Sequence, residues 1–210
     1  MTTDQPSDQP SGTPSPSTPS PSTPSPSTPS TSNTPGASIE QLLGEYERAL
    51  DHTASLWHDL TEDEVRWRPH ERSSAIGWHL GHQAAVAHFM VRNLTAAEPS
   101  PDPGLDALMD GATSEADRGD LPGLDRLAAY RSAVADRLRF RIGNIARGDV
   151  GAPAQLDVIA RTLLVAVVNH EYQHAQWIGE VRSRDLGHEL PPRPRSQLLT
   201  EIDGYCVLAP

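Results

Sequence analysis

Four long segments with helical spacing of apolar residues dominate this chain of 210 residues. They span roughly residues 38–57, 74–94, 122–147 and 154–184. In each segment Leu, Ile, Val or an aromatic residue recurs every three or four positions. Ser38 is a favourable N-cap for the first segment, and Gln41 completes a capping box. No run alternates like a strand, although residues 204–208 could form a short extended segment on the helices. The sequence therefore predicts an all-α fold.

The lengths of the connections indicate how these helices are arranged. About six residues join the third and fourth segments, which favours antiparallel neighbours. Roughly 25 residues join the second and third, enough to cross back along a helix. We therefore expect a four-helix bundle with up-down-down-up topology, in which the second helix starts at the end where the fourth finishes.

Residues 1–36 differ in composition from the rest of the chain. They hold half of the 20 prolines and contain no Leu, Ile, Val or aromatic residue. Such a segment buries too little apolar surface to offset its ordering entropy. We predict a disordered tail rich in Pro, Ser and Thr over residues 1–36, and one domain over residues 37–210.

Charge and composition exclude several classes of function. The formal net charge is −11, and the tail contributes only Asp4 and Asp8 to it. This balance argues against nucleic acid and anionic membranes as partners. All 17 basic residues are Arg, which excludes lysine-based catalysis, and the single Cys206 excludes an intramolecular disulfide. The chain shows no signal peptide and no apolar stretch long enough to span a membrane. We therefore expect a cytoplasmic protein.

The pentapeptide His170-Glu171-Tyr172-Gln173-His174 lies in the last helical segment. Residues four apart on a helix share one face, and two imidazoles at that spacing can bind one metal ion. His82 lies at a similar predicted height on the second segment. A divalent metal site formed by His82, His170 and His174 is therefore expected, and three imidazoles suit zinc, nickel or iron(II).

The motifs around these histidines resemble the DinB superfamily. They are Gly77-Trp78-His79-Leu80-Gly81-His82, preceded by Trp67-Arg68-Pro69, and the stretch from His170 to Gly179. The resemblance covers about residues 38–190. It implies a helical bundle of up-down-down-up topology and a His triad that maps onto His82, His170 and His174. One isomerase branch of this superfamily has Glu in place of the first His of the pair, and this chain has His170 there.

The same pentapeptide also matches the His-Glu-x-x-His signature of zincin peptidases, in which Glu is the general base. The metzincin extension needs Gly at position 177 and His at position 180, where this chain has Trp177 and Glu180. A gluzincin would need a further Glu ligand on another helix downstream, and Glu201 lies in the terminal segment. Glu171 is therefore interpreted as a neighbour of the site or as a solvent-facing residue.

The other candidate residues receive less specific roles. His79 could face the same side as His82, and a position on the surface or beside the metal ligands is favoured over ligation. His52 could reach the site as an acid or base, although a polar contact between helices is the simpler interpretation. Cys206 is expected to be a buried free thiol. Surface positions are expected for His58, His70, His88 and His188. Core or lid packing is expected for Trp57, Trp67, Trp78 and Trp177.

Three functions follow from these features. The first is a metal-dependent thiol transferase, with a thiol such as mycothiol, or a hydrolase-like enzyme, as the resemblance implies. The second is a non-catalytic metal-binding or stress-response protein. The third is a zincin-like metallopeptidase. The expected partners are a small-molecule substrate or thiol and a second copy of the chain in a homodimer.

Overall fold

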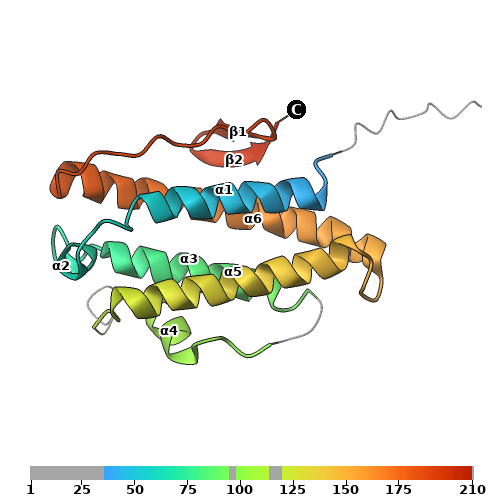
Figure 1. The fold of residues 1–210 in the computed structure, drawn as a ribbon, viewed down its shortest axis with the longest axis horizontal. Coiled ribbons are helices and arrows are strands. Elements are labelled where there is room, and N and C mark those ends of the chain that lie inside the picture. The colour runs from blue at the N-terminus through green and yellow to red at the C-terminus, as the bar shows by residue number, and fades with distance from the viewer. Residues whose placement is uncertain (1–35, 95–97, 114–119, 210) are drawn as a thin grey trace, which may run out of the picture. The chain divides into compact units, whose positions relative to one another are not determined.

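The computed structural model describes residues 36–94, 98–113 and 120–209. Within these ranges the chain is mostly helical, which confirms the all-α class (Figure 1). Of the predicted disordered tail, only Gly36 belongs to the described residues. None of the described helices is long and apolar enough to cross a membrane.

Four long helices correspond to the four predicted segments. They are α1 (Ile39–Ser55), α3 (Ile76–Val91), α5 (Leu124–Ala146) and α6 (Pro153–Glu180). Helix α1 packs on α6, and α3 packs on both α5 and α6 (Figure 1). The capping box of Ser38 and Gln41 at the start of α1 is confirmed. Helix α6 continues into a π-helical turn, η1 (Val181–Asp185), so the full length predicted for the fourth segment is also confirmed.

Two short helices lie in the connections and were not predicted. Helix α2 (Glu62–Arg66) starts at a capping box formed by Thr61 and Glu64. Helix α4 (Pro103–Leu108) starts where the Asp102 side chain accepts a hydrogen bond from the backbone N–H of Leu105. Helices of five or six residues are too short to show a periodic apolar pattern, and for this reason only their caps could have revealed them.

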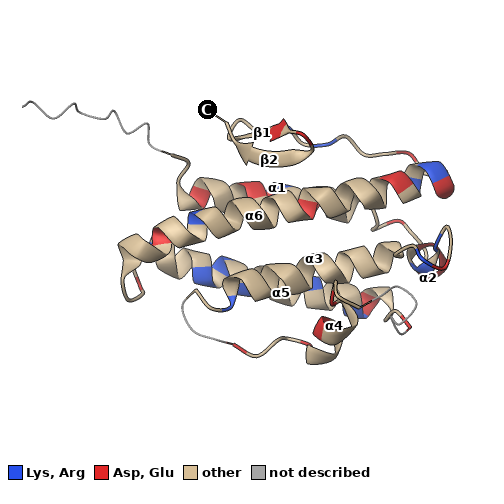
Figure 2. Ribbon diagram, turned by 180° about the vertical axis from the view of Figure 1, so that it is seen from behind, with Lys and Arg blue, Asp and Glu red and all other residues tan. Residues whose placement is uncertain are grey.

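Helix α3 is the most enclosed element of the fold. It carries no Asp, Glu, Lys or Arg, and Figure 2 shows it without any charged residue. Eleven of its 16 residues are buried. A helix that is apolar on most of its circumference must be covered on several sides. Any polar side chain on α3 therefore lies in a place where it needs a partner inside the protein.

The C-terminal segment forms a two-stranded antiparallel hairpin, which the sequence prediction had reduced to one short extended segment. Strand β1 (Leu199–Ile202) pairs with β2 (Tyr205–Leu208), and β2 contacts α6. Asp203 and Gly204 both have positive φ, as a tight two-residue turn requires. The Asp-Gly pair was the signal for this hairpin. The strands are only four residues long, too short to show a clear alternation.

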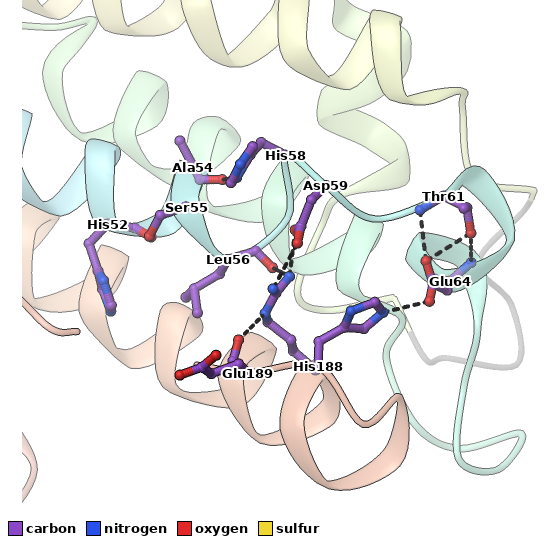
Figure 3. Close-up of polar contacts among 11 residues, drawn as sticks. His52, Ala54, Ser55, Leu56, His58, Asp59, Thr61, Glu64, His188 and Glu189 are labelled. Atoms are coloured by element: carbon purple, nitrogen blue, oxygen red, sulfur yellow. Dashed lines mark hydrogen bonds and ion pairs between the residues drawn. The ribbon is translucent and has the colours of Figure 1, made fainter. Parts of the chain in front are cut away.

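The segment that leads to the hairpin is fastened to the end of α1 and to α2. The guanidinium of Arg182 binds the carboxylate of Asp59, with Nη1 to Oδ1 at 2.6 Å, and also donates to the carbonyls of Leu56 and Glu189. His188 Nε2 lies 2.7 Å from Glu64 Oε1. Figure 3 shows Asp59, Glu64 and His188, the labelled side chains of these two contacts. Residues from η1 and its continuation therefore close this end of the domain.

Candidate metal centre

His82, His170 and His174 lie together inside the helical domain. One ring nitrogen from each lies within 4.8 Å of the other two, so the group could hold a metal ion. His82 comes from α3, whereas His170 and His174 lie one turn apart on α6 and share a face. The ring centroid of His82 lies 5.2 Å from that of His170 and 5.0 Å from that of His174. The predicted juxtaposition of these three side chains is therefore found in the structure.

The His82 ring is held by a backbone carbonyl. Its Nδ1 lies 2.7 Å from the carbonyl oxygen of Met109, just after α4. A carbonyl can only accept, so Nδ1 carries the proton and Nε2 has the lone pair that a metal would need. Trp78 stacks on the same ring, with centroids 4.5 Å apart and planes at 13°. Both contacts fix the plane of the imidazole.

Gly81 explains how α4 approaches α3 so closely. A Cβ on Gly81 would lie 2.5 Å from Met109 Sδ and 2.8 Å from its Cγ. Met109 is fully buried, which leaves its side chain little room to move. The glycine therefore admits the Met109 backbone to hydrogen-bonding distance of His82. This is a packing reason for Gly immediately before His82.

His174 is held by another imidazole. His79 lies one turn before His82 on α3, and its Nδ1 is 2.8 Å from Nδ1 of His174. Both rings are buried. His79 therefore lies beside the candidate ligands, and the alternative of a surface position is wrong.

Burial favours the neutral form of two of the candidate ligands, His170 and His174. Desolvation, with a smaller effect from His82, lowers the pKa of His170 to about 4. Desolvation also lowers the pKa of His174, and the neighbouring rings of His170 and His79 lower it further. Metals bind the neutral imidazole, so these rings are in the form that coordination requires. The donor set fits a divalent ion in its chemistry, its hydrogen bonding and its charge state.

Glu171 is turned away from the three histidines and is not solvent-facing. It is 2% exposed, and its Oε1 accepts from Arg131 Nη2 at 2.6 Å. Arg131 also donates to the carbonyl of Leu80 and to Oε1 of Gln83, whose Nε2 donates to the backbone oxygen of Glu171. The reading of Glu171 as solvent-facing was therefore wrong: successive residues of a helix are about 100° apart, and this direction leads into the core between α3, α5 and α6.

A cleft of about 550 Å³ opens beside the candidate metal centre. Its lining includes His79, His82, His174, Trp78, Trp177 and Arg184. Trp177 is 48% exposed, and its ring lies edge-on to His174 with centroids 4.7 Å apart. Three of the four clustered imidazoles thus border a space that a small molecule could enter, with an indole at its wall.

The remaining candidates lie elsewhere. The ring of His52 packs near Tyr172, with centroids 6.0 Å apart, and one of its ring nitrogens is buried without a hydrogen bond among the described residues. Cys206 lies on β2 and is buried near Arg193, and burial raises the pKa of its thiol. His58 and His70 are exposed, as expected. His188 is half-buried beside Glu64.

The surface position predicted for His88 was wrong. His88 is 3% exposed, and its Nε2 is buried with no hydrogen-bond partner among the described residues. Desolvation lowers its pKa. The apolar sequence of α3 was the available signal, because a helix without charged residues is buried on most sides and takes its histidines with it.

A helical domain with a cluster of histidines between two of its helices defines the class of protein. The model of the DinB superfamily matches residues 45–178, which include all three candidate ligands. The chain therefore belongs to the DinB superfamily. A search of curated proteins found no match.

Proposed function

We propose that His82, His170 and His174 bind one divalent metal ion, which would be zinc, nickel or iron(II). The observation that carries this proposal is the approach of three imidazole nitrogens from two helices to within 4.8 Å of one another. Three histidine ligands with one open position are the pattern of catalytic zinc sites. The up-down-down-up bundle expected from the sequence would place the three at one height, and the contacts of α3 with α5 and α6 support this topology.

We propose further that the protein is a metal-dependent thiol transferase, with a mycothiol-type thiol, or a hydrolase-like enzyme. Membership of the superfamily and the cleft beside His82 and His174 support this. A bound metal would supply Lewis acidity and a lowered pKa for a thiol or water. The chain would hold three coordination positions and leave the cleft side to a small-molecule substrate. The domain of residues 37–210 would carry this activity, with residues 1–36 as a tail.

The zincin alternative receives little support from the position of Glu171. A general base must reach the water or substrate that it deprotonates. The Glu171 carboxylate is instead paired with Arg131 in the core. The non-catalytic metal-binding protein shares the same site and differs only in turnover.

Metal content tests the proposal directly. The full chain should carry about one divalent ion, measured by mass spectrometry of the metal after dialysis. His82→Ala should lose it, whereas His58→Ala, at an exposed position, should retain it. Retention of metal by the His82 variant would overturn the triad.

Turnover separates the enzyme from the binding protein. Mycothiol and other low-molecular-weight thiols would be offered with electrophilic acceptors to the metal-loaded and metal-free chain. Transfer that requires both the metal and His82 supports the transferase. Metal binding without turnover of any acceptor would favour the non-catalytic protein.

A further inference from the structure

A fourth imidazole, that of His79, touches the candidate metal centre without belonging to it. Its nitrogens do not join the group formed by His82, His170 and His174, but its Nδ1 faces Nδ1 of His174 at 2.8 Å. The ring centroids of His79 and His174 are 5.0 Å apart. Both side chains are at least nine-tenths buried. The contact therefore lies largely inside the protein, at the wall of the cleft.

The positions of the protons on the two rings are constrained by this contact. Two facing imidazole nitrogens at this distance form a hydrogen bond only if one carries a proton and the other a lone pair. If His174 uses Nε2 as a ligand, its neutral ring has its single proton on Nδ1. That proton then points at His79, whose Nδ1 accepts it. The same reasoning gives His79 its own proton on Nε2.

The hydrogen-bond acceptors of His82 and His174 differ, and this difference allows the role of His79 to be tested. His82 is oriented by the backbone carbonyl of Met109, which no substitution at that residue removes. His174 is oriented by a side chain, so a single substitution can remove the acceptor. Metal-binding histidines usually donate their other ring N–H to a carboxylate, a backbone carbonyl or water, which fixes the tautomer and raises the basicity of the ligand nitrogen. Here the imidazole of His79 stands in that place.

We propose that His79 is a positioning residue for metal binding, whose Nδ1 accepts the Nδ1–H of His174 and keeps the Nε2 lone pair of His174 directed at His82 and His170. This inference rests on the proposed metal site. It adds a fourth residue that is required for full affinity without being a ligand.

Variants of the full chain test the role of the acceptor. The dissociation constant for Zn²⁺ would be measured by competition with a chromophoric chelator. His79→Leu removes the acceptor and should weaken binding about 10–100-fold with the stoichiometry unchanged. His79→Asn places an amide oxygen the same number of bonds from the backbone, and it should restore most of the affinity. His88→Leu, the same change at a buried position nine residues further along α3, should leave the affinity unaltered.

The outcomes separate this inference from the proposed function. Equal affinity in the wild type and in His79→Leu would overturn the positioning role while leaving the metal site in place. Failure of the wild type to bind, or binding by His82→Ala as tight as the wild type, would overturn the metal site itself.

A measurement on the wild type decides the matter if His79→Leu does not fold. A long-range proton–nitrogen NMR spectrum of the metal-free chain distinguishes protonated from bare ring nitrogens. The proposal requires that Nδ1 of His174 carries the proton and Nε2 does not. The opposite tautomer would overturn it.

Discussion

The carboxylate of Glu171 lies 2.6 Å from the guanidinium of Arg131, and both side chains are buried between α3, α5 and α6. Glu171 is next to His170 in sequence, yet its side chain points into the core on one side of α6. His170 and His174 instead face the candidate metal centre. The ion pair thus links α6 to α5, and through Leu80 and Gln83 it also links both helices to α3. The ion pair and its hydrogen bonds therefore connect the two helices that carry the histidines to α5.

Glu171→Gln should therefore destabilise the protein. It leaves the charge of Arg131 buried without its partner, which typically costs about 3–5 kcal/mol. Urea unfolding monitored by circular dichroism measures this loss, and the folded variant should still bind one metal ion. The double variant Arg131→Met with Glu171→Leu should recover much of the stability, because it removes both charges together. Full stability of Glu171→Gln alone would contradict a structural role for the pair.

Gly81→Ala should both destabilise the fold and weaken metal binding. The new Cβ would overlap buried Met109, and overpacking of this kind costs about 1–3 kcal/mol. Displacement of Met109 would also lengthen its hydrogen bond with His82. Gly44→Ala in α1 is the control, because its Cβ would meet only Arg48 at 3.9 Å. That variant should be more stable than the wild type by up to about 1 kcal/mol. A gain in stability in both variants would show that the fold does not require a glycine at position 81 to accommodate Met109.

His88→Leu should stabilise the protein, by about 1 kcal/mol near pH 8, because it removes a buried polar atom that lacks a partner. Burial lowers the pKa of His88. Below about pH 6.5 the unfolded chain therefore takes up a proton that the folded chain does not, and the wild type loses stability as pH falls. The advantage of the variant should grow between pH 8 and pH 5 in urea unfolding. An advantage that shrinks over this range would show that His88 gains a partner when protonated.

The contribution of the Asp59–Arg182 ion pair to stability should depend on pH in the acid range (Figure 3). The hydrogen bond from Arg182 lowers the pKa of Asp59 to about 2. Since the folded pKa is depressed, the contribution to stability is present above the unfolded pKa, near 4, and is lost as pH falls toward 2. The difference in free energy of unfolding between the wild type and Asp59→Asn should therefore narrow from pH 5 to pH 3. A constant difference would mean that the carboxylate charge contributes nothing.

Local patterns in the sequence were enough to locate the four long helices and the candidate ligands. Helical periodicity depends on residues three or four apart, and the pairing of His170 with His174 on one face follows from the same spacing. His82 could be added because its height along α3 follows from the rise per residue. The periodicity and the His170–His174 pairing depend on one helix at a time, whereas the matching height of His82 also depends on which helix ends meet.

Contacts between distant segments could be decided only by the tertiary structure. The pairing of Glu171 with Arg131, the support of His82 by Met109 and that of His174 by His79 join residues far apart in the chain. Each depends on how one helix is rotated against another, which small residues such as Gly81 set through close packing. The sequence alone determined which histidines could meet. The packing of α3, α5 and α6 decided which atoms hold these histidines. It also directed the side chain of Glu171, part of an apparent peptidase motif, toward the core.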